Sequence, residues 1–299
     1  MNTSTLKGWF ITKNRPLLIR KISVNTLKYL ILLLGAFASI FPLYWMFNIA
    51  VSRWEPLTWL PLNPHWENFI YAWNYMEDPP IWRALLNSTI VTVSRTLLVL
   101  FVSSLTAYAL AIYKFKGRRL IFLWILTQVI FQGTISLMPG ITNLIPMYVL
   151  MGWLGWVNTY WALIIPGVFS AYSIFLMRQY IITIPDDILD AARLSGCSEF
   201  GLYWRMILPL SKPALAAIGL VNAVWVWNDL LWPTLMIKNT QWYTVQQALN
   251  GLFDMRESAQ YLNVVAGCIT IASIPLIVIT ILTQKYIIQG WTGLSYAKR

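Results

Sequence analysis

The sequence predicts an all-α membrane protein with six transmembrane helices, and three observations support this fold class. Hydrophobic residues make up 58% of the chain and charged residues only 11%, whereas an ordinary soluble domain has about 25% charged residues. The apolar residues gather into six stretches long enough to cross a bilayer. No stretch shows the alternating pattern of a membrane barrel. Helices are therefore expected, because a helix satisfies its own backbone hydrogen bonds in lipid.

The expected spans cover residues 27–50, 88–113, 120–138, 159–178, 213–236 and 262–283. They form one transmembrane domain over residues 27–283, which follows an N-terminal tail (1–26), contains a long loop (180–212) and precedes a C-terminal tail (284–299). The first apolar stretch is too long for a cleaved secretion signal, so we read it as an uncleaved span. Prolines and a glycine interrupt the pattern after the third span, so residues 139–158 are expected to form an outward or re-entrant element.

The basic residues predict the orientation of the chain. Most of the 22 Lys and Arg residues fall in the two tails, in the loop at 114–119 and in the loop at 180–212. By the positive-inside rule these segments face the cytoplasm, and so do both termini. This topology accounts for the net charge of +11, so we expect no nucleic-acid partner.

The loop at 180–212 contains the signals of two short helices. The first begins at Pro185 with two acidic residues in its first turn and ends just before Gly196. The second begins at Ser198 as its N-cap and is expected to stop at Pro209. Two helices joined at a glycine would make a stiff corner, and we call residues 185–210 the bracket.

The bracket resembles the EAA loop in the permease subunits of ATP-binding-cassette (ABC) importers. That loop carries an acid, two alanines, a glycine four residues later and a distal Ile-Leu-Pro. The corresponding residues here are Asp190, Ala191, Ala192, Gly196 and 207–209.

Two positions depart from the common form of this motif. Asp190 stands where Glu is usual, and Ser195 stands where an Asp often precedes the glycine. The segments 175–179, 211–214 and 227–233 resemble the carbohydrate branch of the same family. The resemblance extends from about Asn87 to the C-terminus.

The resemblance implies a bacterial inner-membrane permease subunit that carries a carbohydrate, such as an oligosaccharide. Its expected partners are a second homologous permease, two ATPase subunits and an extracytoplasmic solute-binding protein. The chain has no G-x-x-x-x-G-K-[ST] phosphate loop, so ATP and Mg²⁺ are expected to bind to the partner ATPases. We find no catalytic set or metal-ligand cluster, so no catalysis and no cofactor of its own are expected.

In this interpretation the bracket sits in a groove of the ATPase and turns its closure into a tilt of the attached spans. The small alanine side chains allow the helix to lie close to the ATPase surface, and the glycine permits a sharp turn of the chain after the helix. The charged residues could fix the position of the bracket in the groove. The expected coupling residues are Asp190, Ala191, Ala192, Arg193, Gly196, Glu199, Arg205 and Pro209.

The fifth span carries the best candidates for lining a solute path. If the span is one helix, Asn222, Trp225, Asp229 and Trp232 fall within an arc of about 80°. Indoles can cover the apolar face of a pyranose, while an amide and a carboxylate pair with its hydroxyls. Tryptophans near a membrane boundary are also common without any ligand, so both readings stay open.

Three further residues, Trp242, Tyr243 and Gln246, lie in an outward loop (237–261) that could contact the binding protein or could simply be a wet loop. Arg95 stands inside the second span, where a charge is costly. It needs a carboxylate partner, a route to the surface or a place in the solute path.

Two other classes of protein make different demands on the sequence. An ion-driven secondary carrier would need buried carboxylates in mid-membrane, and here only Asp229 lies near any span. An integral membrane enzyme would need catalytic side chains that we do not find.

Overall fold

The computed structural model describes residues 3–52, 59–60, 63–75, 78–134, 141–254 and 262–296. Side chains in the helical segments near both chain ends and beside the other gaps are outside the description. The described part of the chain contains helices and turns and no strand. The fold class predicted from composition is thus confirmed as all-helical.

The helices from the N-terminus to the middle of the chain are α1 (Thr3–Val51), α2 (Glu67–Tyr75), α3 (Ile81–Ile112), α4 (Arg118–Thr134), α5 (Ile141–Trp153), α6 (Tyr160–Ile164), η2 (Ile165–Gly167) and α7 (Ala171–Ile181). The remaining helices are α8 (Asp186–Leu194), α9 (Glu199–Leu202), η3 (Tyr203–Ile207), α10 (Leu208–Leu210), α11 (Lys212–Trp227), α12 (Leu231–Met236), η4 (Thr240–Trp242), α13 (Val245–Asp254) and α14 (Leu262–Tyr296).

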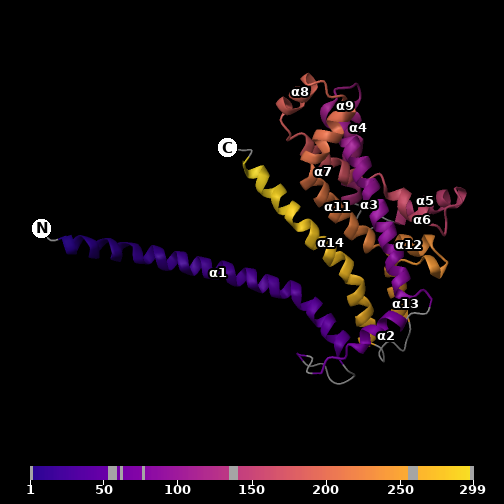
Figure 1. Ribbon diagram of the computed structural model, residues 1–299, viewed down its shortest axis with the longest axis horizontal. Coiled ribbons are helices and arrows are strands. Elements are labelled where there is room, and N and C mark those ends of the chain that lie inside the picture. Colours follow the sequence, from indigo (N-terminus) through magenta and orange to yellow (C-terminus); the bar gives the residue numbers. More distant parts are fainter. Residues whose placement is uncertain are drawn as a thin grey trace.

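Helix α3 is the central element of the bundle. It packs against α7 and α11 along its length, and α6, α13 and α2 also contact it. Figure 1 shows α8 and α9 at one end of α3 and α2 and α13 at the opposite end. The bracket and the segment that follows the fifth span are therefore at opposite ends of the same long helix.

Helices α1, α3 and α14 contain apolar segments long enough to cross a membrane, at Asn25–Val51, Ile81–Ile112 and Leu262–Lys285. Two bent helix pairs raise the number of candidate spans to five. The third expected span corresponds to α4, whose described part ends at Thr134, and residues 135–140 lie outside the description.

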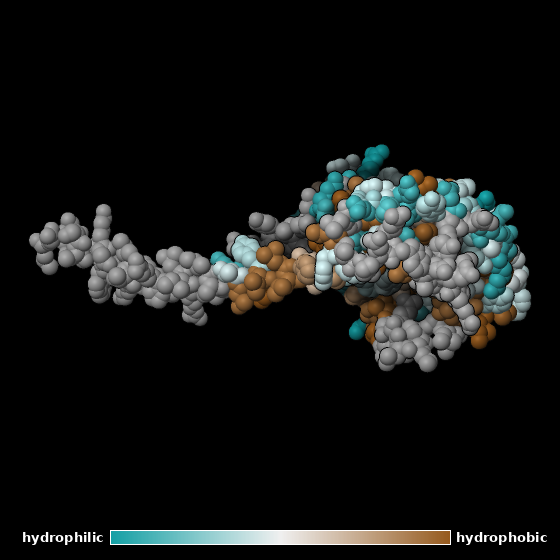
Figure 2. All heavy atoms as spheres, turned by 90° about the horizontal axis from the view of Figure 1, so that it is seen from below, coloured by the Kyte–Doolittle hydropathy of each residue, from teal (hydrophilic) through white to brown (hydrophobic). Residues whose placement is uncertain are grey.

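The apolar segment of α1 stands away from the bundle. None of its most apolar 18-residue window is buried, and its leucine side chains are exposed. Figure 2 shows this stretch as a brown stalk beside the rest of the molecule. Only the C-terminal end of α1 is held, where it meets α2 and α14.

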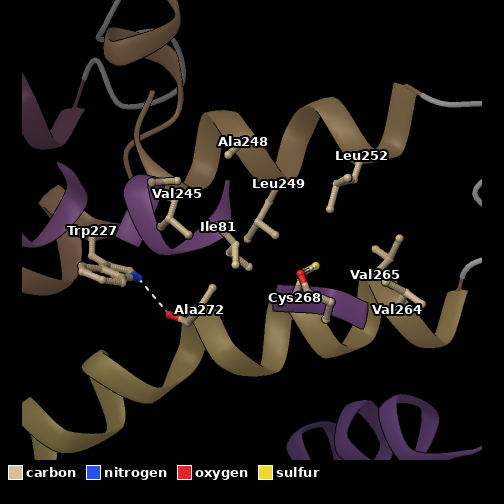
Figure 3. Close-up of a cluster of buried hydrophobic side chains, with 12 residues drawn as sticks. Ile81, Trp227, Val245, Ala248, Leu249, Leu252, Val264, Val265, Cys268 and Ala272 are labelled. Atoms are coloured by element: carbon tan, nitrogen blue, oxygen red, sulfur yellow. Dashed lines mark hydrogen bonds between the residues drawn. The ribbon is translucent and has the colours of Figure 1, made fainter. Parts of the chain in front are cut away.

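The core at the α2 end is built by α2, α3, α11, α13 and α14 (Figure 3). Here Trp227 packs among small and branched residues and donates a hydrogen bond from its indole N–H to the carbonyl of Ala272, at 3.2 Å. Cys268 is fully buried in the same cluster. The cysteine is a packing residue here.

Two expected spans are broken rather than straight. The fourth span bends by 43° between Gly167 and Ala171, where Ser170 caps α7 by accepting a hydrogen bond from the backbone N–H of Ser173, at 3.2 Å. The expectation of one continuous fifth helix over 213–236 was wrong. Helix α11 ends at Trp227, and α12 starts only at Leu231.

Arg95 lies in the middle of α3 and packs on the bend of the fourth span. Its guanidinium donates to the carbonyl of Leu163 at 3.5 Å. A side-chain carbon at Gly167 would collide with this guanidinium. Gly167 therefore provides the space in which the charge is held.

We predict that Gly167→Ala destabilises the protein by about 1–3 kcal/mol, because the added methyl group must displace Arg95 from a packed site. The midpoint of thermal unfolding of the full chain in detergent measures this effect. Gly152→Ala in α5 is the matched control, since an added carbon there meets no atom within 4 Å. Equal midpoints for the two variants would contradict the packing of Arg95 on Gly167.

Candidate functional site: the bracket

The first helix of the bracket forms as its local signals predict. Pro185 is the N-cap of α8, Asp186 and Asp187 occupy the first turn, and the helix ends at Leu194. Gly196 then has a positive φ of 79°. An added side-chain carbon at this glycine would meet no atom within 4 Å, so the backbone conformation, and not a lack of space, favours glycine here.

The second helix of the bracket begins as predicted but does not end as predicted. The Ser198 hydroxyl accepts a hydrogen bond from the backbone N–H of Gly201, at 3.2 Å. The expectation that Pro209 stops the helix was wrong, because the helix runs on to Leu210 and turns by 74° at Ser211. A π-helical turn over Tyr203–Ile207 precedes the proline. The wider turn loosens the backbone at the position where the proline ring would otherwise clash.

The inner face of the bracket is packed into the helix bundle. Leu189 of α8, Leu202 of α9, and Tyr203 and Ile207 of the π turn are each at most 1% exposed. They share one core cluster with side chains of α3, α7 and α11. The bracket is thus a continuation of the bundle and not a loop that hangs from it.

Polar contacts centred on Glu199 join the bracket to the end of α3. Its carboxylate accepts hydrogen bonds from the hydroxyls of Tyr113, at 2.7 Å, and Tyr108, at 3.0 Å. Arg193 donates to the same carboxylate at 3.2 Å and to Asp190 at 3.2 Å. Glu199 therefore ties α8, α9 and α3 to one another.

These contacts favour the charged form of the glutamate. The hydrogen bond from Tyr113, followed by those from Arg193 and Tyr108, holds the pKa of the Glu199 carboxyl below its ordinary value. Contact with Glu199 and Asp190 raises the pKa of Arg193. Both groups are therefore ionised at neutral pH.

The outer face of the bracket is apolar at its tip. Leu194 is 90% exposed, Phe200 is 70% exposed and Trp204 is 54% exposed. The rings of Phe200 and Trp204 stack at 6.2 Å with an angle of 14° between their planes. A rigid element with an exposed leucine and an aromatic pair has the composition of a protein-binding surface.

The structure separates the expected coupling residues into two groups. Ala192 is half-buried against the inner core and Glu199 faces α3, so these two residues help to hold the bracket against the helix bundle. Exposed on the bracket are Asp190, Ala191, Arg193, Gly196, Arg205 and Pro209. The tyrosines of α3 and the exposed Leu194 and Phe200 were missed, although two tyrosines just before a basic loop were visible in the sequence.

The expected stripe on the fifth span is not a single surface. Asn222 is buried and donates to the Ser173 hydroxyl at 3.0 Å. Trp225 is 62% exposed and lies 5.9 Å from the ring of Tyr172. The break after Trp227 moves the other two residues out of the predicted arc.

Beyond this break, Asp229 and Trp232 contact the fourth and second spans. The Trp232 indole N–H donates to the carbonyl of Ala162 at 2.8 Å. Asp229 accepts from the backbone N–H of Trp232 at 3.3 Å and faces Arg95 across a cavity of about 10 Å³. Of the three options considered for Arg95, pairing with a carboxylate thus has a nearby candidate.

All three residues considered for contact with a binding protein make contacts within the chain. The ring of Trp242 packs edge-on against Tyr160 at 4.6 Å. The carbonyl of Tyr243 accepts a hydrogen bond from Asn87 at 2.9 Å. Gln246 is half-buried and lies 3.4 Å from the side-chain oxygen of Asn228. Residues 255–261 of this loop lie outside the description.

A helical bundle with long apolar helices, and with a bracket packed against one end of it, defines the class of polytopic membrane proteins. The comparison with protein families identifies it further. Residues 22–293 match the family described as binding-protein-dependent transport system inner membrane component, and the chain belongs to this family.

Named relatives agree with this family. The chain is 32% identical over 267 residues to the arabinooligosaccharides transport system permease protein AraQ of Halalkalibacterium halodurans, covering 86% of this chain and 91% of that protein. It is 33% identical over 275 residues to the probable ABC transporter permease protein YurM of Bacillus subtilis, covering 89% of this chain and 86% of YurM.

Two more distant similarities extend the comparison. The chain is 29% identical over 272 residues to the sn-glycerol-3-phosphate transport system permease protein UgpE of Yersinia pestis, covering 88% of this chain and 94% of UgpE. Its fold matches a chain in the crystal structure of a bacterial ABC transporter involved in the import of the acidic polysaccharide alginate. The TM-score is 0.75 at 23% identity, and the match covers 92% of this chain and 98% of the other.

We predict that Glu199→Gln lowers the stability of the protein at neutral pH by a few tenths to about 1 kcal/mol, because the exposed ion pair and the charge-assisted hydrogen bonds weaken. The folded-state pKa of Glu199 is lowered. Its contribution is therefore complete above the ordinary glutamate value of about 4.3 and is lost as the pH falls through the folded-state pKa.

The thermal midpoints of wild type and variant, measured at neutral and at acid pH, test this prediction. The difference should be present at pH 7 and shrink below about pH 4. Asp187→Asn is the control, since Asp187 is an exposed acid of α8. A difference that stays constant across this range would show that the charge of Glu199 does not matter.

We predict that Gly196→Ala loosens the bracket, because a residue other than glycine at this positive φ costs about 1–2 kcal/mol. Amide hydrogen exchange at the end of α8 should speed up while the core of α3 stays protected. Gly251→Ala in α13 is the control, since that helical glycine also has open space around it. Unchanged exchange at α8 would mean that the turn tolerates a side chain.

Proposed function

We propose that this chain is a permease subunit of an ATP-driven ABC importer for a carbohydrate, and that its ATPase partners dock on the outer face of the bracket. The family name supports transport with a binding protein. Among the similar proteins, one is named for arabinooligosaccharides and one for alginate, which are both sugar polymers. The expected cargo is therefore an oligosaccharide, delivered by an extracytoplasmic binding protein.

The observation that carries the docking proposal is the contrast between the two faces of the bracket. Its inner face is sealed into the bundle through Leu189 and Tyr203. Its tip presents Leu194 and Phe200 to solvent. A partner that covers such an exposed leucine stabilises the complex, by roughly 25 cal/mol for each Å² of apolar area that is buried.

The inner face supports a mechanical role. A push on α8 meets Leu189, which is packed against α3, α7 and α11. Glu199 adds a polar connection from α9 to Tyr108 and Tyr113 at the end of α3. Because packed interiors resist compression, movement of the bracket is expected to move the three helices with it.

The topology we propose has six spans with both termini and the bracket in the cytoplasm. The third span would contain α4, the fourth would be the bent pair Tyr160–Gly167 and Ala171–Ile181, and the fifth would be α11 with α12. The C-terminal end of α1 and the N-terminal end of α14 meet at α2, at the end of the molecule opposite the bracket. This arrangement agrees with the basic residues of the tails and of the loop at 114–119.

The exposed apolar segment of α1 supports the proposal that a second permease subunit is a partner of this chain. Lipid covers part of such a helix, and a homologous subunit is expected to cover the rest. ATP and Mg²⁺ are assigned to the ATPase subunits, and this chain contributes no catalytic step. The transport path would lie between the two permeases, with the exposed Trp225 and its neighbour Tyr172 as candidates for contact with the sugar.

We predict that the double variant Leu194→Glu, Phe200→Glu weakens association with the ATPase subunits by at least about tenfold, because two exposed apolar anchors become charged. Co-purification of the assembled importer and uptake of a labelled oligosaccharide should both fall. The variant permease should still insert and melt normally, since both side chains are exposed.

Trp153→Glu is the control for this experiment. Trp153 is 83% exposed, and it lies at the end of α5, on a different part of the molecule. The control should leave ATPase association unchanged. Normal ATPase binding and uptake by the double variant would overturn the docking proposal.

A further inference from the structure

A second feature of the molecule lies outside the bracket. A cavity of about 820 Å³ lies where α3 ends and α4 begins, against the last turn of α7. Residues 114–120, Phe122, Leu123 and Arg178 line it. We call it the basic cavity.

Five cationic side chains meet in the basic cavity, and its lining includes no acidic residue. The five are Lys114, Lys116, Arg118, Arg119 and Arg178. Like charges that line one cavity repel one another, so this grouping favours an anionic ligand that reduces the repulsion. The positive-inside rule explains why these residues are cytoplasmic, but it does not require them to line one cavity.

Two of the five cations are fixed by neutral groups. Arg118 donates to the carbonyls of Tyr113, at 3.1 Å, and Ala111, at 3.2 Å. Arg178 donates to the carbonyl of Leu110 at 3.1 Å and lies 3.8 Å from the centre of the Phe122 ring. These contacts orient the two guanidiniums without neutralising their charge.

The other three cations are available to a ligand. Lys114, Lys116 and Arg119 are exposed and have no hydrogen-bond or ion-pair partner in the described part of the chain. The basic cavity therefore combines two guanidiniums that are oriented by hydrogen bonds with three exposed cationic side chains. Arginine and lysine side chains in such a grouping bind phosphate through charge-assisted hydrogen bonds.

The apolar part of the lining distinguishes among phosphate-containing ligands. Phe115 is 43% exposed, Leu120 is 73% exposed and Leu123 is 47% exposed. All three lie at or beside the first turn of α4, where an expected span enters the membrane. A free phosphate ion makes no use of these side chains, whereas a phospholipid places its phosphate on the cations and its acyl chains on the apolar residues.

We propose that the basic cavity is a binding site for the headgroup of an anionic phospholipid at the cytoplasmic membrane surface. Basic cavities between membrane helices on the cytoplasmic side are suited to such headgroups. The bound lipid would neutralise part of the charge at the α3–α4 corner and hold this corner at a fixed depth. This site rests on the proposed topology, which puts the α3–α4 corner at the cytoplasmic surface, but it is separate from the bracket and does not depend on the docking proposal.

The test compares lipid retention by the full-length chain and by the variant Lys116→Gln, Arg119→Gln. Each purified protein is mixed in detergent with phosphatidylglycerol or with phosphatidylcholine, and bound lipid is counted by native mass spectrometry. Wild type should retain phosphatidylglycerol in preference to phosphatidylcholine. The double variant should bind phosphatidylglycerol at least about tenfold more weakly, because two cations near an anionic headgroup are removed.

The matched control is Lys28→Gln, Lys212→Gln, which removes the same charge from two exposed lysines outside the basic cavity. It should retain phosphatidylglycerol like wild type. If both variants lost phosphatidylglycerol equally, the effect would come from overall charge, and the proposed lipid site would be overturned. Displacement of the lipid by millimolar inorganic phosphate would assign the site to a free anion instead. Loss of ATPase binding with unchanged lipid retention would assign it to a protein partner.

Discussion

The burial of the inner face of the bracket is the interaction on which the rest of the structure depends. A fully buried leucine or isoleucine stabilises a fold by roughly 1.5–3 kcal/mol, and Leu189, Leu202 and Ile207 are all buried here together with Tyr203. The exposed ion pairs of Arg193 each contribute at most about 1 kcal/mol. Packing therefore holds the bracket in place, and the charges around Glu199 set its orientation.

Helix α3 connects this packing to the far side of the molecule. Near its first turns, Asn87 donates to the carbonyls of Gln241 and Tyr243, both at 2.9 Å. Ser88 accepts from the backbone N–H of Val245 at 2.8 Å. A helix of 32 residues spans about 48 Å. One continuous helix therefore contacts both the bracket and the segment around η4.

The sequence predicts the features that depend on neighbouring residues and misses those that depend on distant ones. Pro185, Gly196 and Ser198 act through their own turns, and the structure confirms all three. The tyrosine partners of Glu199 lie 86 and 91 residues away from it, so the pattern around Glu199 does not show which distant residues it meets. Pro209 shows the same limit, because the π turn that accommodates it is packed against the bundle. The coupling roles themselves stay predictions.

The break in the fifth span and the arginine in the second span explain each other. An arginine at the centre of a membrane costs about 2.5–3.5 kcal/mol on insertion scales, and Arg95 needs acceptors to offset this cost. Ending α11 at Trp227 releases the chain from helical geometry and lets Asp229 turn toward Arg95. The bend of the fourth span supplies the Leu163 carbonyl on the other side. The two irregular segments thus bring a carbonyl and a carboxylate close to the one charge inside the second span, which is how the bundle accommodates Arg95.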